Sequence, residues 1–382
     1  MNQIITSLLD NDLYKFTMLN AVLKTYPGRQ VEYTFHNRDG RIISEEVSGE
    51  IRNQVRLMST VKLTQVEEIY LRKKFPMFDE EFFEFIKNYR FDPFDVTITG
   101  LHGDFSVTYK GLWENTILWE VPLMGIISET YFGINHPNTS LSQFKTNTAE
   151  KGKLIFSEKL EVIEFGTRRR FSKLTQSLAI SILKMNKAIV GTSNMYFGMI
   201  HNLDVKGTTA HEWTMAHGAM FGYKDANNKA LRAWQKVYGT SLNVALTDTY
   251  SSKVFFEGFN KEDAISVSGL RQDSGNPIEY TDLALQYYKD KNIPSRNKTI
   301  MYSDSLNIEK AIIIKKHRPD ENHKVYGIGT YFTNDIEGIK PLNIVIKMSS
   351  FEGKPTVKIS DDLGKNTGDS QEILTCKKEL NL

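Results

Sequence analysis

The pattern of apolar and polar positions changes character along the chain near residues 115–140. In the first part, VEYTFHNR (31–38) and DVTITG (95–100) alternate apolar with polar residues, as half-buried strands do. Between them, FPMFDEEFFEFIKNYRFDPFD (75–95) has apolar residues at helical spacing and predicts an amphipathic helix that ends at Pro93. The first part of the chain is therefore predicted to form an α+β layer.

After about residue 160, apolar runs typical of strands recur, and most of them are followed by a helical stretch. The seven runs are EVIEFGTR (161–168), AIVGTSN (188–194), LDVKGTTAH (203–211), LNVALTDTY (242–250), ISVSGLRQDSG (265–275), TIMYSDS (299–305) and VYGIGTYF (325–332). Strands that alternate with helices imply a parallel sheet with right-handed crossovers. Seven units favour a closed or nearly closed β/α barrel, with an open doubly wound sheet as the alternative. In both folds, ligands bind at the carboxyl ends of the strands.

Composition indicates a globular protein and limits the classes of partner. The 382 residues are 40% hydrophobic and 25% charged, and 48 basic residues balance 46 acidic ones to a net charge of +2. This balance gives no sign of a nucleic-acid or membrane partner. No secretory signal is expected, because residues 1–18 lack a basic n-region and a long apolar h-region, and no apolar run approaches the roughly 20 residues that span a bilayer. A single cysteine, Cys376, excludes an internal disulfide and a thiolate metal cage, so we expect a cytoplasmic protein.

Three consecutive arginines follow a strand end in EFGTRRRFS (164–172). Arginines at a helix start oppose the helix dipole unless they converge with backbone N–H groups on an anion. Such a run is more often a solvated surface, but the preceding Gly-Thr favours anion binding by at least one of the three. Phe165 is either a core residue or a wall for a flat substrate.

Two histidines occur in LDVKGTTAHEWTMAHGAMFG (203–222). His211 and His217 are six positions apart, about 240° around a helix, so they cannot share a zinc ion as the two histidines of HExxH do. His217 is interpreted as an ordinary helix residue. His211 is either a histidine packed at a helix start or a base or nucleophile at the barrel mouth. Asp248, in TDTY, is its expected partner, although it could also cap the following helix.

The last strand ends carry charged residues and glycines. Arg271 and Asp273 in LRQDSGNP lie two apart, on the same face of a strand end. They suit an anionic substrate, with the carboxylate left for Mg²⁺ or sugar hydroxyls, or they form a purely structural ion pair.

A phosphate site is expected in the last two units, YSDSLN (302–307) and YGIGTYFTND (326–335). The last units of a β/α barrel commonly hold phosphate on loop backbone and a helix N-terminus. Gly327, Gly329 and Thr330 would let the backbone approach a phosphate closely. The G-x-G-T pattern is a weak signal alone and a moderate one at this place in the chain.

Taken in order, these motifs closely resemble the nicotinate phosphoribosyltransferase family. The residues that carry the resemblance are NDLYKFTM, YTFHNR, EFGTRRR, GTSN, KGTTAHEW, TDTY, RQDSGNP, YSDSLN and YGIGT. It implies formation of nicotinate mononucleotide and pyrophosphate from nicotinate and 5-phosphoribosyl 1-pyrophosphate, coupled to ATP hydrolysis, in NAD salvage. It also implies an irregular, incomplete β/α barrel, placed at 126–339. A second α+β domain, at 1–125, would be completed by 340–382.

The resemblance also implies roles for individual residues. His211 would be phosphorylated from ATP, with Asp248 as its orienting partner. The nicotinate-binding residues would be Tyr14, which reaches in from the neighbouring subunit of a homodimer, Phe165, Arg168, Thr208 and Arg271. The residues for phosphoribosyl pyrophosphate would be Asp273, Asp304, Gly327, Gly329 and Thr330, and Mg²⁺ would enter with the substrates and could meet Asp273.

The choice of base depends on the GTSN motif. Nicotinamide-using relatives carry an aspartate there, whereas this chain has Ser193. With no negative charge at this position to repel a carboxylate, nicotinate is favoured over nicotinamide. A quinolinate phosphoribosyltransferase would need a denser basic pocket. A non-catalytic regulator that binds phosphoribosyl pyrophosphate would not need the His211–Asp248 pair.

Overall fold

The computed structural model describes residues 1–100, 105–207, 209–362 and 365–382, which fall into two compact units. The first unit comprises Met1–Lys153, Glu164–Lys206 and Gly329–Lys347, and the second comprises Leu154–Ile163, Gly207–Ile328 and Met348–Leu382. Each unit is built from three segments, because the chain passes repeatedly between them. The units therefore do not follow the expected boundary near residue 125.

The first unit contains an antiparallel sheet. Strand β3 (Ser106–Leu112) pairs with β1 (Gln30–Asn37) on one side and with β2 (Val96–Thr99) on the other. The register sets Tyr33 opposite Tyr109, and their buried rings stack with centroids 4.5 Å apart. The two strands predicted in this region are confirmed.

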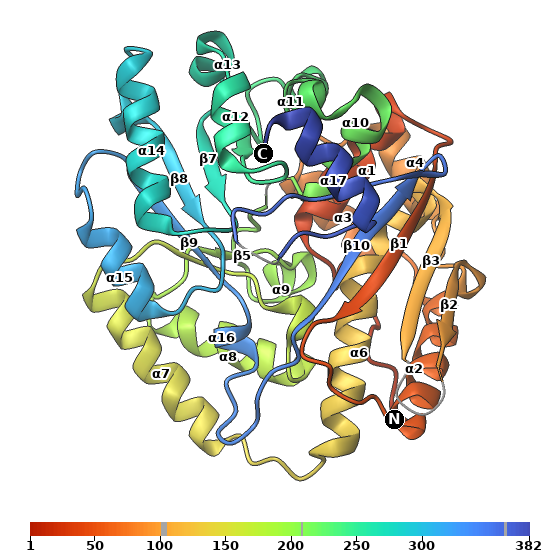
Figure 1. Ribbon diagram of the computed structural model, residues 1–382. Coiled ribbons are helices and arrows are strands. Elements are labelled where there is room, and N and C mark those ends of the chain that lie inside the picture. The colour runs from red at the N-terminus through yellow and green to blue at the C-terminus, as the bar shows by residue number, and fades with distance from the viewer. Residues whose placement is uncertain (101–104, 208, 363–364) are drawn as a thin grey trace. The chain divides into compact units, whose positions relative to one another are not determined.

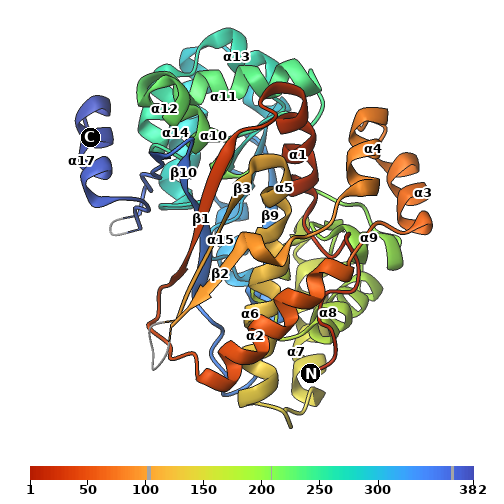
Figure 2. The ribbon, with the colours of Figure 1, turned by 90° about the vertical axis from the view of Figure 1, so that its right-hand side faces the viewer.

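Helices supply most of the rest of the first unit, and Figure 2 shows α2 and α6 side by side. Their bounds are α1 (Leu13–Thr25), α2 (Glu45–Leu57), α3 (Gln65–Lys74), α4 (Glu80–Asn88), α5 (Trp113–Thr116), α6 (Glu120–Asn135), α8 (Lys173–Met185), α9 (Met195–Ile200) and α16 (Thr330–Thr333), while α7 (Ser142–Ser157) runs on into the second unit. The helix predicted to end at Pro93 is shorter than expected. Asp79 caps its start by accepting from Phe82 N–H, and Tyr89 ends it in an extended conformation.

The second unit is built on a parallel sheet. Strands β6 (Val244–Leu246), β7 (Gly269–Gln272), β8 (Thr299–Tyr302) and β9 (His323–Ile328) pair in chain order. Figure 1 shows β7, β8 and β9 next to one another with α14 and α15 outside them. The helices of this unit are α10 (His211–Phe221), α11 (Tyr223–Tyr238), α12 (Ser252–Gly258), α13 (Lys261–Ser266), α14 (Pro277–Asp290), α15 (Ile308–Lys316) and α17 (Ser370–Leu380), and its C-terminal segment adds β11 (Lys354–Pro355), which pairs with the end of β10 (Ile344–Phe351).

The barrel is incomplete, as expected. Six of the seven predicted runs form strands, including β4 (Val162–Glu164) and β5 (Gly191–Thr192), and β6 is left as an edge strand. The run at residues 203–211 is the exception, because its described residues make only one bridge, between Val205 and Thr192. The glycine and polar residues that follow Val205 do not continue the ladder, so this prediction of a strand is wrong.

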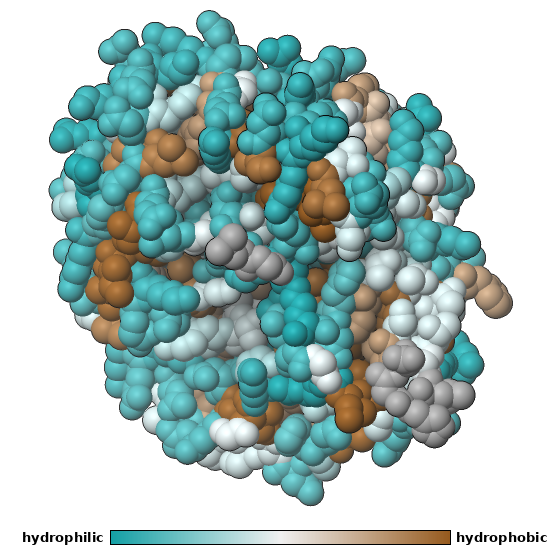
Figure 3. Space-filling view, viewed as in Figure 1, coloured by the Kyte–Doolittle hydropathy of each residue, from teal (hydrophilic) through white to brown (hydrophobic). Residues whose placement is uncertain are grey.

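The surface in Figure 3 is mainly hydrophilic, with apolar residues scattered in small groups. Within the described ranges, no helix has the length and apolar character required to cross a membrane.

A buried ion cluster ties the first unit together around Arg170. This arginine is fully buried, and its two terminal nitrogens donate to the two Asp10 oxygens at 2.8 and 3.0 Å. Its Nε donates to Glu129 Oε1 at 2.7 Å. The charge of Arg170 outweighs the burial that alone would raise the pKa of Asp10, and holds that pKa far below its usual range.

Replacing Arg170 by Met is expected to lower the free energy of unfolding by about 3–5 kcal/mol, because two carboxylates lose their buried partner. Urea denaturation of the wild type and the variant would measure the difference in the free energy of unfolding. Arg56→Met, on an exposed position of α2, should change stability by no more than about 0.5 kcal/mol. Equal losses in the two variants would contradict the assignment.

Candidate active site

His211 is the first residue of α10 and is 4% exposed. The preceding N-cap residue, Ala210, offers no side-chain cap. The imidazole is held at both nitrogens, with Nδ1 3.0 Å from Thr249 Oγ1 and Nε2 3.1 Å from Asp273 Oδ2. The ring is therefore fixed in orientation by one hydroxyl and one carboxylate.

Asp273 is surrounded by donors. Its Oδ1 accepts from Arg271 Nη2 at 3.0 Å and from Ser303 Oγ at 2.5 Å. Burial alone would raise the pKa of Asp273, but the Arg271 charge and the His211 hydrogen bond hold it well below its usual range. An ionised carboxylate only accepts hydrogen bonds, so Nε2 of His211 carries a proton. In the neutral ring, the lone pair is then on Nδ1, facing the Thr249 hydroxyl.

The hydrogen bond expected between His211 and Asp248 is absent from this arrangement, and that prediction of pairing is wrong. Asp248 is fully buried, and its Oδ2 accepts from Lys358 Nζ at 3.0 Å and from Ser274 Oγ at 2.6 Å. Successive side chains of an extended segment point to opposite sides, so Thr249 faces the ring and Asp248 faces away from it.

Asp248 also does not cap the helix that follows. Ser251 is the N-cap of α12, and its side chain accepts from Val254 N–H. The catalytic role predicted for Asp248 stays a prediction, now without direct contact with the imidazole.

The three arginines at 168–170 have separate partners in the first unit and do not form a solvated run. Arg170 is the buried ion partner described above, and Arg169 Nε donates to the Ile344 carbonyl at 2.9 Å. Arg168 is 34% exposed, and its Nη1 lies 3.4 Å from Glu120 Oε1. Arg168 and Arg169 are thus both partly exposed, and the guanidinium of Arg168 is the one paired with a carboxylate side chain.

Glu120 joins Arg168 to a second cation. Its other oxygen lies 2.6 Å from Nζ of the buried Lys15. Burial alone would raise the pKa of Glu120, but the charges of Lys15 and Arg168 lower it to about 2. Phe165 lies near this cluster in sequence and is half-buried. The predicted Arg168 site thus contains an ionised carboxylate that sequence reasoning missed.

A buried carboxylate also stands beside Ser193. The Ser193 hydroxyl donates to Asp12 Oδ1 at 2.8 Å, and both residues are buried. Burial raises the pKa of Asp12, although Arg168 and the Ser193 hydrogen bond oppose this shift. Position 193 is uncharged as predicted, but its surroundings contain a carboxyl group from α1's N-cap. Tyr14, two residues further on, is 5% exposed.

Glu164, at the end of β4, is a second buried carboxyl group that sequence reasoning did not single out. It is fully buried and accepts from Thr192 Oγ1 at 2.6 Å, Gly166 N at 2.5 Å and Gln176 Nε2 at 3.0 Å. Burial outweighs these hydrogen bonds and raises its pKa to about 7. A glutamate directly before a strand-end Phe-Gly was the available signal.

The raised pKa of Glu164 predicts a pH-dependent stability. Because the folded protein favours the protonated form, its contribution is fully present below the ordinary pKa of 4.5 and is lost as pH rises to about 7. In the wild type, the free energy of unfolding should fall by on the order of 3 kcal/mol between pH 4.5 and pH 8 because of Glu164, and Glu164→Gln should not show this fall. Thermal denaturation across this range would show a flatter profile for the variant, whereas exposed Glu81→Gln should keep the wild-type profile.

The predicted phosphate-binding residues are placed differently from one another. Gly329 is the N-cap of the four-residue helix α16, and Thr330 is its first residue. A Cβ at Gly329 would lie 2.8 Å from the Phe165 carbonyl oxygen, so glycine is required for this close approach. Gly327 is instead buried inside β9, which does not fit the expected phosphate contact. Thr208, predicted to contact nicotinate, lies outside the described residues.

Asp304 is a partly exposed carboxylate of the second unit. Its Oδ1 accepts from Ser305 Oγ at 3.1 Å, and its Oδ2 lies 3.8 Å from Lys365 Nζ. Burial raises its pKa despite the Lys365 charge. With a side chain 25% exposed, it can still reach a sugar hydroxyl or a hydrated cation.

A metal cage supplied by the protein alone is not found in the described ranges, where no three His, Cys, Asp or Glu side chains converge. Asp273 already accepts from Arg271, Ser303 and the His211 ring. That Mg²⁺ enters with the substrates stays a prediction.

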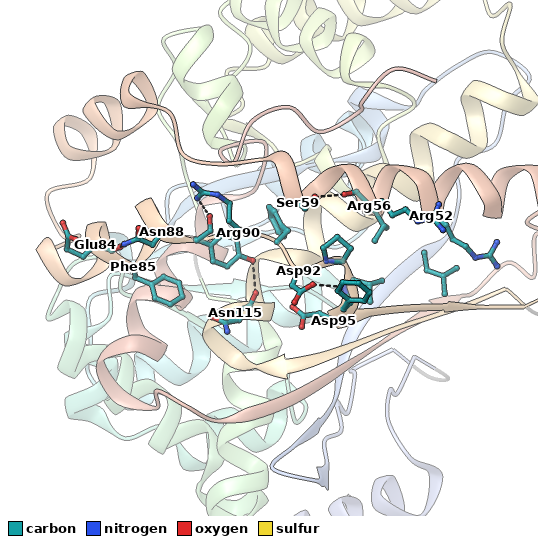
Figure 4. Close-up of a pocket in the computed structure, with 17 residues that line it drawn as sticks. Arg52, Arg56, Ser59, Glu84, Phe85, Asn88, Arg90, Asp92, Asp95 and Asn115 are labelled. Carbon is teal, nitrogen blue, oxygen red and sulfur yellow. Dashed lines mark hydrogen bonds between the residues drawn. The ribbon is translucent and has the colours of Figure 1, made fainter.

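A cavity of about 1200 Å³ opens in the first unit, away in sequence from every predicted site residue. Figure 4 shows Arg52 and Arg56 of α2 and the carboxylates of Asp92 and Asp95 around it. Burial and the neighbouring Asp92 raise the pKa of Asp95 to about 6. The lining of the cavity contains charged residues of both signs.

Comparison with known proteins covers nearly the whole chain. Residues 9–128 match the nicotinate phosphoribosyltransferase (NAPRTase) N-terminal domain, and residues 160–382 match the nicotinate phosphoribosyltransferase (NAPRTase) family. The chain is 40% identical to a nicotinate phosphoribosyltransferase of Desulforapulum autotrophicum, over 98% of this chain and 99% of the relative. It is 38% identical to a probable nicotinate phosphoribosyltransferase of Schizosaccharomyces pombe, over 98% of both chains.

Solved structures agree with this result. The fold resembles the crystal structure of nicotinate phosphoribosyltransferase from Porphyromonas gingivalis, with a TM-score of 0.97 and 36% identity over 99% of this chain and 100% of that one. It also resembles a putative nicotinate phosphoribosyltransferase from Saccharomyces cerevisiae, with a TM-score of 0.96 and 33% identity over 100% of this chain and 99% of that one.

Proposed function

Because this chain belongs to the nicotinate phosphoribosyltransferase family, we propose that it makes nicotinate mononucleotide and pyrophosphate from nicotinate and 5-phosphoribosyl 1-pyrophosphate. The proposal includes coupling to ATP hydrolysis through a phosphohistidine at His211, and a place in NAD salvage. The family supports phosphoribosyl transfer to nicotinate. The surroundings of His211 support the coupling.

The observation that carries the coupling is the fixed imidazole of His211, with Asp273 at Nε2 and Thr249 at Nδ1. A carboxylate at one nitrogen fixes the tautomer and makes the other nitrogen the nucleophile. Nδ1 would attack the γ-phosphorus of ATP, so that an N–P bond forms as the P–O bond to ADP breaks. The positive charge that develops on the ring is then stabilised by the ionised Asp273. Hydrolysis of the N–P bond returns the free histidine and phosphate.

Ribosyl transfer to nicotinate needs no strong general base from the protein. The pyridine nitrogen of nicotinate carries no proton to remove, so the chain has to position two substrates and balance the charge on the departing pyrophosphate. Arg168 would hold the nicotinate carboxylate, and Arg271 would serve the ribosyl region. Mg²⁺ bound to the pyrophosphate would neutralise part of its charge, and Asp304 would meet ribose hydroxyls.

The phosphohistidine would regulate substrate binding. Phosphorylation adds about −1.5 to −2 charge beside the site. We infer that this charge reorganises the phosphate-binding loops toward tighter binding, and that breakdown of the N–P bond relaxes them and releases product.

Nicotinate is the proposed base, and nicotinamide is the alternative. The neutral Ser193 favours a carboxylate, whereas the neighbouring Asp12 adds a carboxyl group whose charge is disfavoured by burial. Assays of both bases with phosphoribosyl pyrophosphate, ATP and Mg²⁺ should show product with nicotinate at a rate at least about 10²-fold above that with nicotinamide, since charge-matched sites discriminate strongly. Equal rates would overturn the choice of base. A chain that releases no pyrophosphate would be a binding regulator instead.

The assembly proposed for the enzyme is a cytoplasmic homodimer with shared active sites. Tyr14 is the residue expected to cross between subunits, and its burial within its own chain makes it the critical point of this proposal. Light scattering would give the oligomeric state. Mixing equal amounts of His211→Asn and Tyr14→Ala chains should make about half of the dimers heterodimers, each with one intact site of two, and so restore about a quarter of the wild-type activity if sites are shared across a two-fold assembly.

A further inference from the structure

The C-terminal segment 356–361 runs beside the strand-end segment that follows β6. The backbone N–H of Ile359 donates to the Thr249 carbonyl at 2.8 Å, and Ser251 N–H donates to the Ile359 carbonyl at 2.9 Å. These bonds fix the backbone on both sides of Tyr250, which forms a parallel bridge with Ile359. Since Thr249 Oγ1 lies 3.0 Å from Nδ1 of His211, the C-terminal segment sets the position of a group that touches the imidazole.

The side chain of Lys358 adds a second contact between the C-terminal segment and the residues that follow β6. It is 7% exposed, and its Nζ donates to Oδ2 of the fully buried Asp248 at 3.0 Å. The same oxygen accepts from Ser274 Oγ, and Ser274 Oγ accepts from the Asp361 N–H at 3.2 Å. Ser274 is adjacent to Asp273 in the chain. One segment thus holds the immediate neighbours of both groups that contact the His211 ring.

The segment is itself firmly anchored within the second unit. Lys358 and Thr367 exchange two backbone hydrogen bonds, at 2.8 and 3.0 Å. The neighbours of Lys358 belong to an apolar cluster of buried residues made up of Tyr223, Ala226, Tyr250, Val357, Ile359, Cys376 and Leu380. Burial also raises the pKa of the Cys376 thiol to about 12, as expected for a packing residue. The backbone of Lys358 is therefore held in place by hydrogen bonds and buried apolar neighbours, and this fixes the position of its ammonium beside Asp248.

We propose that Lys358 is a positioning residue for phosphorylation of His211. Through Asp248 and Ser274, and through the pairing of Ile359 with Thr249, it holds Thr249 and Asp273 at the two ring nitrogens. The inference rests on the proposed function, because it concerns the transfer of phosphate from ATP to His211. It gives residues 356–361 a role in the active site, whereas the sequence indicated only that the C-terminal part of the chain completes a domain.

Charge supports this assignment as well as geometry. A phosphorylated His211 would add about −1.5 to −2 charge next to two carboxylates, Asp273 and Asp248. Arg271 neutralises Asp273 directly, at 3.0 Å. Lys358 pairs with Asp248 at 3.0 Å, so each of the two carboxylates has a cation beside it that weakens its repulsion of the incoming phosphate.

A salt bridge that only stabilised the fold would behave differently. Loss of Lys358 would then lower the amount of folded protein and would reduce every activity of the chain by one factor. A positioning role predicts a selective loss of phosphate transfer. The test therefore compares two activities of the same folded chain.

The experiment uses the full-length chain with Lys358→Met, Lys358→Arg and the control Lys354→Met. Lys354 is exposed on β11 of the same segment, with its Nζ 3.3 Å from the Ala219 carbonyl. Two rates are measured per folded molecule, namely labelling of His211 from ATP carrying labelled γ-phosphate and nucleotide synthesis without ATP. We expect Lys358→Met to slow labelling about tenfold or more with synthesis changed less than about twofold, since small misplacements of reacting groups cost up to about 10²-fold. Lys358→Arg should restore part of the labelling, and Lys354→Met should match the wild type.

The opposing results are defined in advance. Wild-type labelling in Lys358→Met, or an equal loss of both activities, would overturn the positioning role. If Lys358→Met does not fold, Lys358→Arg decides by the same two rates, because it keeps the charge beside Asp248 and changes only its position. A partial fall in labelling with unchanged synthesis then supports the positioning role, and an equal change in both rates overturns it. If the wild type takes no label, the proposed coupling fails and the inference fails with it, and that result is seen before any variant is compared.

Discussion

His211→Asn should abolish labelling of the chain by ATP carrying labelled γ-phosphate, and with it the stimulation of nucleotide synthesis by ATP. The asparagine amide stands where Nδ1 of the imidazole does, beside Thr249, and has no nucleophilic lone pair comparable to that of the imidazole. A fall in labelling of on the order of 10²-fold or more is expected, the range that single groups contribute in proton and nucleophile chemistry. Mapping of acid-labile label to one residue of the wild type would complete the measurement.

His323→Asn is the matched control for this prediction. His323 is 50% exposed, and its ring lies 2.8 Å from Glu161 Oε2 and 3.1 Å from Thr299 Oγ1 within the second unit. It should label and respond to ATP as the wild type does. Full stimulation by ATP in His211→Asn, or label on another residue, would remove the phosphohistidine from the mechanism.

Asp273→Asn and Asp248→Asn should differ in their effect on labelling, because only Asp273 contacts the His211 ring. The neutral amide in Asp273→Asn no longer fixes the Nε2–H tautomer or stabilises the charged ring, and a fall of up to about 10⁴-fold has the precedent of an aspartate that orients a catalytic histidine. Asp248→Asn keeps an oxygen for Lys358 and Ser274, so a smaller fall, on the order of tenfold, is expected.

The measurement is the labelling rate per folded molecule, with thermal denaturation as a check on folding. Asp273→Asn is expected to remain folded because Arg271 keeps Ser303 and the Thr209 carbonyl as partners. An Asp248→Asn chain that loses labelling more severely than Asp273→Asn would restore Asp248 as the principal partner of His211.

Much of the fold could be predicted because its signals are local. Apolar runs that end in small or polar residues correctly placed six strands, and helices follow two of them at Lys173–Met185 and Pro277–Asp290. The run at 203–211 failed, because strand formation depends on a neighbouring partner and not on apolar character alone. The early end of α4 has the same kind of cause, since Tyr89 turns to bond the Asn115 carbonyl at 2.8 Å, a contact 26 residues away.

The sequence was sufficient to predict which strand ends carry the residues of the candidate site. His211 starts a helix and Arg271 and Asp273 lie at a strand end, as expected, and the three are in contact; their roles stay predictions. Their pairing could not be deduced in the same way, since the choice between Asp248 and Asp273 depends on the direction of each side chain. Buried carboxyl groups were missed for a related reason. Asp12 and Glu164 look like ordinary polar residues in the sequence, and only burial gives them raised pKa values.

The sequence by itself determined the class of fold, the ordered motifs that place the chain in its family, and the exclusion of a shared zinc site at His211 and His217. The class of fold and the exclusion of the zinc site follow from periodicity and spacing, whereas the family follows from a resemblance carried by motifs in order along most of the chain. The tertiary structure alone decided that Asp273 and Thr249 hold His211, and that Lys358, 110 residues after Asp248, supports them. Such contacts join residues far apart in the sequence, and their geometry depends on backbone pairing and side-chain direction that no local pattern records.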